Sequence, residues 1–347
     1  MDNVIPHSKP WITAEDYEAI RDVLSSNMIG QGARCRALEQ RLAHWIGADD
    51  GVAVGSGSAA LVLALYALEI ESGDEIILPS YVCRSVLEAV LSVEGKPVLC
   101  DVGNDWVITA ETVMRQITTK TRAIIAPHMY GIFCDIGAIR SLGIPVIEDC
   151  AQAVSSESLR QIQGDLAVFS FHPTKCFTAG EGGVVVSKSK ALIDRMRSYR
   201  DGEKVSLKAR LFSSMSDITA SLAMSQLDRF PQILLRRRNI ADHYLNALMQ
   251  ARLARINNQA FEQSMFFRFP VIVEGGIESC QESFLQRGIQ IRRGVDSLLH
   301  RSMQLDDGQF QTSVRLFNTT VSLPIYPALS NEDELRCTEA VTHIFAD

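Results

Sequence analysis

The sequence predicts an α/β protein in which a mostly parallel, seven-stranded sheet lies between helices. Seven short apolar runs alternate with segments of helical periodicity, an alternation typical of strands buried on both faces by crossover helices. The runs are residues 52–54, 75–78, 97–100, 123–126, 145–148, 166–170 and 183–187. The helical patterns between and after them cover residues 58–70, 83–94, 110–117, 135–142 and 189–199. A loop joins the last two runs, so the last strand could run antiparallel.

Further helices flank this alternation. Residues 11–24 have helical spacing, with Thr13 as the N-cap and Asp16 three residues later, and residues 34–46 form a second helix. A long helical pattern at 216–250 contains Pro231, which predicts a break or kink there. The chain after it predicts a small α+β domain, with apolar segments at 266–273 and 288–294 and helices at 278–287 and 331–345. We therefore expect a large domain at 1–235 and a small domain at 236–347.

Composition and charge exclude several classes of protein. The chain has 347 residues and a net charge of −7, which argues against binding to nucleic acid or to an anionic membrane. The triplet Arg236-Arg237-Arg238 is interpreted as a solvated helix face. The polar N-terminus does not resemble a signal peptide, and no apolar run reaches membrane-spanning length. The 8 cysteines contain no CxxC pair and no metal-binding spacing, which favours a reduced, cytoplasmic enzyme without a metal.

An acid, a hydroxyl and an amine follow neighbouring apolar runs. Asp149 follows the run at 145–148, Ser170 ends the run at 166–170, and Lys175 precedes the glycine-rich AGEGG turn. The carboxyl ends of parallel strands meet at one edge of a sheet, so these three side chains could face one ligand. A carboxylate and an amine that converge in this way suit pyridoxal phosphate. The amine can bind the cofactor covalently, and the carboxylate can keep its ring nitrogen protonated.

A second candidate site lies where the first strand joins a helix. Gly55-Ser56-Gly57-Ser58 allows close backbone approach, and the helix N-terminus attracts phosphate. The same letters fit a loose dinucleotide fingerprint. That hypothesis requires an acid at the end of the next strand, where the sequence has Leu78-Pro79-Ser80. A phosphate-binding turn is therefore favoured, and a tight turn without a ligand is the alternative.

The motifs around Asp149 resemble the DegT/DnrJ/StrS family of sugar aminotransferases. The resemblance rests on Asp149, Ala151, Gln152 and Ala153, then GD, FSF, Lys175 and GEGG, and extends from about Ile12 to about Phe345. It implies a fold-type-I pyridoxal-phosphate enzyme. It also implies amino transfer from an amino acid, L-glutamate, to a nucleotide-linked keto sugar, by a ping-pong mechanism in a homodimer with active sites at the interface.

The resemblance assigns roles to individual residues. The residues that it implies for the cofactor are Gly57, Ser58 and Ser170 at the phosphate, Asp149 at the ring nitrogen, Gln152 at the ring hydroxyl, and Lys175 as catalytic residue and covalent attachment. Three further residues are candidate substrate contacts: His172, Glu181 and His300. Each also has an ordinary structural alternative. The two histidines could be solvated or packed against other side chains, and the glutamate could have a purely structural role.

Two positions depart from the family pattern. Where members stack an aromatic ring on the cofactor, this chain has Cys83, and Tyr81 two residues earlier would share that face if the segment is extended. Either residue could lie over the ring. Many members also carry an asparagine before the MSDI segment (215–218) that reaches the phosphate of the neighbouring subunit, and here Phe212 takes its place.

Three alternative functions remain open at this point. One is another pyridoxal-phosphate reaction, such as dehydration or elimination, on the same scaffold. The second is a non-catalytic regulatory protein, which the two departures favour and the intact Asp149, Gln152, Ser170 and Lys175 disfavour. The third, a nicotinamide oxidoreductase, rests only on the loose glycine pattern.

Overall fold

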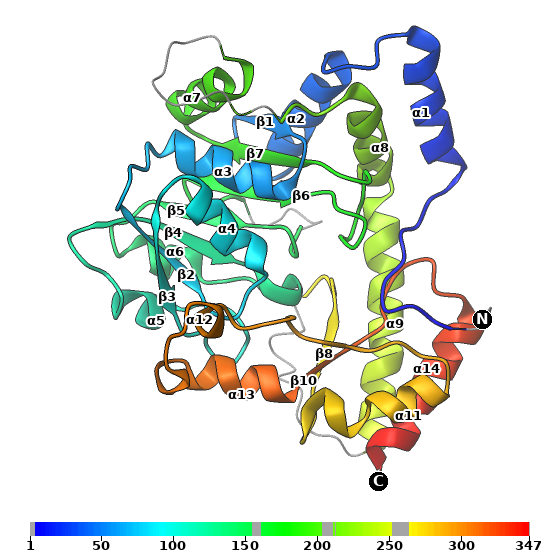
Figure 1. Cartoon of the computed structure of the whole chain (residues 1–347). Coiled ribbons are helices and arrows are strands. Elements are labelled where there is room, and N and C mark those ends of the chain that lie inside the picture. The colour runs from blue at the N-terminus through cyan, green and yellow to red at the C-terminus, as the bar shows by residue number, and fades with distance from the viewer. Residues whose placement is uncertain (1–3, 155–160, 203–210, 212, 252–263, 347) are drawn as a thin grey trace.

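The computed structural model describes residues 4–154, 161–202, 211, 213–251 and 264–346. A seven-stranded sheet with the strand order β1-β7-β6-β5-β4-β2-β3 forms its centre (Figure 1). The strands are β1 (Asp50–Val54), β2 (Glu75–Pro79), β3 (Lys96–Cys100), β4 (Thr121–Pro127), β5 (Val146–Asp149), β6 (Leu166–Ser170) and β7 (Gly183–Ser187). β7 pairs antiparallel with both β1 and β6, and the other pairs are parallel. The prediction of a mostly parallel sheet is confirmed, and the last strand, whose direction the sequence left open, runs antiparallel.

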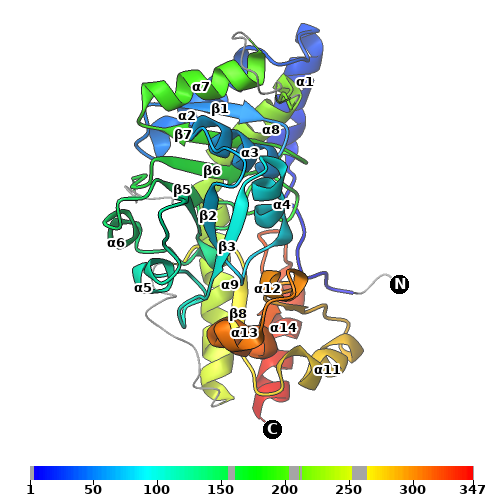
Figure 2. The same cartoon turned by 60° about the vertical axis from the view of Figure 1, so that its left-hand side comes forward.

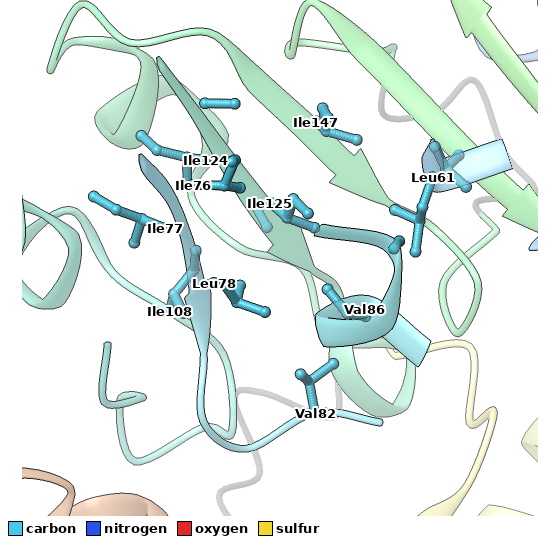
Figure 3. Close-up of a cluster of buried hydrophobic side chains, with 14 of the residues drawn as sticks. Leu61, Ile76, Ile77, Leu78, Val82, Val86, Ile108, Ile124, Ile125 and Ile147 are labelled. Carbon is cyan, nitrogen blue, oxygen red and sulfur yellow. The ribbon is translucent and has the colours of Figure 1, made fainter. Parts of the chain in front are cut away.

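The sheet is buried on both faces because successive side chains of a strand point to opposite sides. In β7, Val185 belongs to the core that contains Leu61, whereas Val184 and Val186 belong to the core that contains Leu38. Leu61 lies in α3 (Gly57–Ala67) and Leu38 in α2 (Ala33–Trp45), so these two helices cover opposite faces. Figure 3 shows the first core, where isoleucines of β2 and β4 pack near helices α3 and α4.

The remaining helices that precede Pro231 lie around the large sheet. They are α1 (Ala14–Ser26), α4 (Arg84–Ser92), α5 (Ala110–Met114), α6 (Ile136–Arg140), α7 (Lys190–Asp201) and α8 (Asp217–Asp228). Thr13 is the N-cap of α1, as predicted, and its N–H donates to the Asp16 carboxylate at 2.9 Å. Asp16 is fully buried and also accepts a hydrogen bond from Ser225 of α8 at 2.7 Å, which holds α1 against α8.

The long helical pattern divides near Pro231, as predicted. α8 ends at Asp228, and α9 (Phe230–Gln250) begins with the proline in its first turn, where a missing N–H costs no hydrogen bond. α9 then runs without interruption past residue 235. The proposed domain boundary therefore falls within this helix and remains a proposal.

A second, smaller sheet lies beside the C-terminal half of α9 (Figures 1 and 2). Its antiparallel order is β8-β10-β9. Its strands are β8 (Phe269–Ile272), β9 (Arg292–Arg293) and β10 (Thr320–Leu323). The helices in the same part of the chain are α11 (Gln281–Gln286), α12 (Leu299–Ser302), α13 (Gln311–Thr319) and α14 (Asn331–Ala346). The sequence patterns anticipated α11 and α14 but neither α13 nor β10. The N-terminal segment joins this part, since Ile5 N–H donates to Gly288 O at 2.7 Å.

The arginine triplet is not a solvated face, contrary to the sequence interpretation. Arg237 is only 3% exposed, Arg236 is half-buried, and only Arg238 is exposed. Arg237 shares one face of α9 with the buried Ile233 and Ile240, four residues before it and three after it. None of the described helices has the length and apolar composition needed to cross a membrane.

Candidate active site

The carboxyl ends of β4, β5 and β6 meet at one edge of the large sheet. In the strand register, Asp149 lies opposite Pro127 of β4 and Val168 of β6. Ser170 ends β6, and the loop that carries Lys175 follows it. The structure therefore gathers the predicted acid, hydroxyl and amine on one edge.

Asp149 is a buried carboxylate in this edge. Burial raises the pKa of Asp149 above its usual value of 3.8, and the N–H of Ala151 together with the ammonium of Lys175 lowers it again in part. The Ala151 N–H donates to Asp149 Oδ1 at 3.0 Å. Lys175 is thus near enough to act on Asp149 electrostatically. A buried carboxylate of this kind suits a cationic partner.

Backbone hydrogen bonds hold the loop of Lys175 against β6. Lys175 N–H donates to His172 O at 2.8 Å, and Ala179 N–H donates to Phe171 O at 2.9 Å. The side chain of Lys175 is half-buried, and its Nζ lies 5.3 Å from the centre of the Phe267 ring. This lysine therefore lies in a defined, partly apolar pocket and not on an open surface.

The glycine turn before α3 fits closely against the end of β6. A Cβ atom on Gly57 would lie 2.6 Å from the Cβ of Ser170, so only glycine fits this position. Ser56 caps α3 by accepting the Ala59 N–H at 3.1 Å, and it pairs with Gly182 of the AGEGG turn. Ser58 is exposed in the first turn of the helix. The turn, β6 and the lysine loop consequently form one continuous site.

Gln152 is half-buried just beyond Asp149. Its Oε1 accepts the N–H of Tyr130 at 3.1 Å. Tyr130 has a φ of 58°, a left-handed conformation that is rare for a residue with a large side chain. The Gln152 side chain therefore helps to hold a strained turn at the end of β4.

The structure separates Tyr81 from Cys83. The Tyr81 ring is fully buried, and its hydroxyl lies 3.0 Å from the Tyr130 hydroxyl. Cys83 is solvent-accessible at the start of α4. The surrounding protein and the Asp149 carboxylate raise the pKa of the Cys83 thiol, whereas Lys175 lowers it. A residue that lines a cleft is expected to be accessible to solvent and to lie near the charged groups of the site, as Cys83 is. The structure therefore favours Cys83 over Tyr81 as the residue beside a bound ligand.

The candidate substrate residues differ in exposure. His172 and Glu181 are exposed beside the lysine loop. His300 is fully buried and stacks on Phe310 with ring centres 4.3 Å apart. Its ring nitrogens lie 2.5 Å from Ser80 Oγ and 2.9 Å from Asp307 Oδ1, which leaves no nitrogen free for a substrate. Phe212 lies outside the described residues.

Sequence reasoning missed two groups of residues near this edge. His128 follows β4 and is buried; its Nδ1 accepts the Cys134 N–H at 3.1 Å, so Nε2 carries the proton and donates to Glu148 at 3.1 Å. The position of His128 two residues after a predicted strand was the available signal. The second group, arginines around Lys175, comes from three distant segments, and no local signal connects them.

A family model described as the DegT/DnrJ/EryC1/StrS aminotransferase family matches residues 10–342. The chain belongs to this family. The predicted resemblance and the predicted enzyme class are therefore confirmed.

Solved structures similar to this DegT/DnrJ/EryC1/StrS chain extend the comparison. The aminotransferase TlmJ from Streptoalloteichus hindustanus is 25% identical, with a TM-score of 0.88 and coverage of 99% of both chains. S. venezuelae DesV is 27% identical, with a TM-score of 0.85 and coverage of 95% of this chain and 94% of that chain. Spr1654 from Streptococcus pneumoniae, a candidate sugar aminotransferase, is 25% identical in its PMP form, with a TM-score of 0.88 and coverage of 99% and 98%.

These findings identify the fold, the cofactor and the reaction class. The fold is that of the fold-type-I aminotransferases, and the matched structures include PLP and PMP forms of Spr1654. Like other DegT/DnrJ/EryC1/StrS aminotransferases, the protein is a pyridoxal-phosphate-dependent sugar aminotransferase.

The residues present fit the cofactor. A buried carboxylate, Asp149, stands near an amine, Lys175, and an exposed helix N-terminus stands beside Ser170. The close contact between Gly57 and Ser170 brings backbone N–H groups of the turn to the end of β6, as phosphate binding requires. Bound pyridoxal phosphate supplies an electron sink for the charge that develops at the reacting substrate carbon.

Proposed function

We propose that this aminotransferase transfers the amino group of L-glutamate to a nucleotide-linked keto sugar in two half-reactions. The observation that carries the proposal is that the loop of Lys175 leaves β6 at the sheet edge where β5 ends in the buried Asp149, and that this edge also contains the Gly57–Ser170 contact. The acceptor and the donor follow from the family resemblance. The homodimer, the cytoplasmic location and the division into domains at residue 235 belong to the same proposal.

The buried acid and its neighbours orient the cofactor ring. Asp149 holds the proton of the ring nitrogen, because a carboxylate there stabilises the positive charge that burial would otherwise disfavour. Gln152 contacts the ring hydroxyl. Cys83 lies beside the cofactor ring, where the family pattern has an aromatic residue. The buried Tyr81 side chain packs in the core beneath the same segment.

The helix N-terminus binds the phosphate group. Ser58 and Ser170 donate their hydroxyls, and the backbone of Gly57 donates its N–H. The positive end of the α3 dipole adds a favourable interaction with the anion.

Lys175 is the catalytic residue. Its Nζ would hold the cofactor covalently, and bound pyridoxal phosphate would supply the electron sink for the donor carbon. The freed Nζ then takes the proton from the α-carbon of the donor, a role that suits an amine already held by its loop. His172 and Glu181 are exposed near Lys175 and contact the substrate at the entrance.

The visible spectrum of the purified protein with added pyridoxal phosphate tests the proposal. The wild type should show the absorption band of a lysine-bound cofactor, and L-glutamate should bleach it with release of one keto acid per site. Lys175→Ala should lack the band, whereas Lys190→Ala, a change at an exposed lysine of α7, should retain it. A band that glutamate leaves unchanged would exclude glutamate as the donor, and an unaltered Lys175→Ala enzyme would refute the site.

A further inference from the structure

The side-chain amide of Gln152 has a single orientation. Its partner is the backbone N–H of Tyr130, at 3.1 Å, and a backbone N–H can only donate. The amide oxygen must therefore face Tyr130, and the NH2 group must lie on the other side of the planar amide. Among the described residues, this NH2 group has no hydrogen-bond partner. Gln152 is consequently a half-buried donor whose direction is set by a backbone group.

Tyr130 presents its N–H from a strained turn after β4. Tyr130 has a φ of 58° and a ψ of 16°, and Gly131 follows with a φ of 87°. A residue with a Cβ atom is disfavoured in this left-handed region, and it stays there only where its surroundings hold it. A Cβ atom on Gly131 would lie 2.9 Å from the backbone N of Met265, so the turn has no room to relax on that side.

The side chain of Tyr130 anchors the turn in the core. Its ring is fully buried and meets the Trp106 ring edge to face, with ring centres 5.7 Å apart. Its hydroxyl lies 3.0 Å from the Tyr81 hydroxyl. Its backbone oxygen accepts the Ser264 hydroxyl at 3.0 Å. Three distant segments therefore hold the ring, the hydroxyl and the carbonyl of this one residue, and together they fix the direction of its N–H.

The same turn also contacts the strand that ends in the buried acid. The N–H of His128, two residues before Tyr130, donates to Asp149 O at 3.0 Å. Gln152 follows Asp149 by three residues. The turn at 128–131 thus supports the backbone of the acid and the side chain of the glutamine. In the proposed function both of these residues face the cofactor ring.

A fixed NH2 group limits what Gln152 can bind. It can donate a hydrogen bond but cannot accept one, so its partner must be an acceptor atom. Hydrogen bonds to an ionised oxygen are stronger than hydrogen bonds to a neutral one. An amide held in this orientation therefore favours an oxygen that has lost its proton over a hydroxyl that keeps it.

We propose that Tyr130 is a positioning residue, which holds the Gln152 amide so that its NH2 group donates to the ring oxygen of pyridoxal phosphate. This inference rests on the proposed function, in which Gln152 contacts the ring hydroxyl and Lys175 carries the cofactor. Tyr130 is buried and acts only through Gln152. The donated hydrogen bond stabilises negative charge on the ring oxygen. It therefore favours loss of the proton that this oxygen shares with the nitrogen of the lysine-bound cofactor.

Hydrogen exchange of the Tyr130 amide in the cofactor-free protein tests the contact. Gln152→Met removes the acceptor and should speed this exchange about tenfold, because one hydrogen bond is lost. Gln152→Glu keeps an acceptor oxygen and should leave the exchange as slow as in the wild type. Gln163→Met, at an exposed position before β6, is the matched control and should change nothing. Equal exchange in the wild type and in Gln152→Met would refute the contact.

The pH dependence of the visible absorption band tests the donor role in the holoenzyme. The band moves when the lysine-bound cofactor loses its shared proton. Without the NH2 donor that proton is held more tightly, so the midpoint should rise by about 1–2 pH units in Gln152→Met and in Gln152→Glu. The titratable groups placed at this edge, Asp149, Lys175 and Cys83, are the same in both variants. An unmoved midpoint in Gln152→Met would exclude donation to the ring oxygen.

Two substitutions of Tyr130 test the positioning role. Tyr130→Gly keeps the N–H and relieves the strain, but it removes the ring that anchors the turn. The absorption midpoint should therefore rise, and adding Gln152→Met should raise it no further, because both changes remove the same interaction. Tyr130→Phe keeps the N–H and the ring and should retain the wild-type midpoint. A wild-type midpoint in Tyr130→Gly would show that Tyr130 does not orient Gln152, whatever stability is lost.

A milder variant keeps the test open if Tyr130→Gly does not fold. Ser264→Ala removes the hydroxyl that binds Tyr130 O and should raise the midpoint in the same direction, by a smaller amount. An unmoved midpoint in Ser264→Ala together with unchanged exchange of the Tyr130 amide would count against the positioning role.

The same measurements separate this inference from the proposed function. A wild type without a lysine-bound band would refute the proposed function, and the donor role of Gln152 with it. A normal band that L-glutamate bleaches, combined with unmoved midpoints in the Gln152 variants, would refute this inference alone.

Discussion

Gly57 is so close to Ser170 that a Cβ atom at position 57 would lie 2.6 Å from the serine Cβ. The contact joins the N-terminus of α3 to the end of β6. It determines how closely the backbone of the turn approaches the edge at which Asp149 and Lys175 lie.

Gly57→Ala should therefore weaken both the fold and cofactor binding. The added methyl group overlaps Ser170, so either the turn or β6 must move, and we expect a loss of roughly 1–3 kcal/mol in the free energy of unfolding. Urea unfolding and titration with pyridoxal phosphate measure the two effects. Gly30→Ala is the control, because no atom lies within 4 Å of a Cβ at that position. Equal cofactor affinity in the two variants would contradict the proposed phosphate site.

Asp149→Asn should reduce activity but not stability. Burial raises the pKa of Asp149, so the folded state holds its proton more tightly than the unfolded state does. The corresponding stability is present at low pH and is lost as pH rises through the folded pKa. At neutral pH the carboxylate therefore costs stability, and asparagine removes that cost.

We expect turnover by Asp149→Asn to fall about 100- to 1000-fold, because a key electrostatic group is lost. The unfolding midpoint of the cofactor-free variant should equal or exceed that of the cofactor-free wild type. Asp22→Asn, at an exposed position of α1, should change neither quantity. A variant with full activity would exclude Asp149 as the partner of the ring nitrogen.

Asp217→Asn should destabilise the protein in a pH-dependent way. The Asp217 carboxylate accepts the N–H groups of Gly32 at 2.8 Å and Cys35 at 3.0 Å. Burial alone would raise its pKa, but these backbone N–H groups, the Cys35 N–H foremost, lower the pKa of Asp217 below its usual 3.8. The stability that the ionised group contributes is thus present above pH 3.8 and is lost as pH falls through the lowered folded pKa.

At neutral pH we expect Asp217→Asn to lose about 1–2 kcal/mol of unfolding free energy. The difference from the wild type should narrow as the pH falls below 3.8, and urea titrations at several pH values measure it. A difference that is constant with pH would mean that the lost hydrogen bonds, and not the charge, matter.

His300→Gln should affect stability and leave the KM for either substrate unchanged. The side chain is buried between Ser80, Asp307 and the Phe310 ring, and glutamine cannot reproduce both hydrogen bonds and the stacking. We expect a loss of roughly 2 kcal/mol in thermal or denaturant unfolding. His172→Gln, at an exposed position, should leave stability unchanged. A raised KM in His300→Gln with normal stability would restore His300 as a substrate contact.

The strands of the large sheet could be predicted because their signal is local. A strand buried on both faces requires a continuous apolar run, as in residues 183–187, whichever helices cover it. β10 is equally buried, but it contains Thr320 and Ser322, and its burial depends on the segments packed around it. Its local sequence therefore did not indicate a strand.

The site residues at the edge of the sheet could also be predicted from local sequence patterns. Asp149, Ser170 and Lys175 each follow an apolar run, and the topology of parallel strands brings such positions together. Three arginines could not be assigned in this way. Arg237, Arg268 and Arg292 come from α9, the approach to β8, and β9, and only packing brings them to Lys175.

The sequence by itself determined the alternation of strands and helices in the large sheet, the reversed last strand as an option, and the acid, hydroxyl and amine at one sheet edge. These depend on the periodicity of apolar residues and on where each run ends. Only the tertiary structure decided that Tyr81 is buried while Cys83 is accessible, that Arg237 is enclosed, and that His300 has internal partners for both ring nitrogens. Burial and charge pairing depend on contacts between distant segments, and such contacts leave no pattern along the chain.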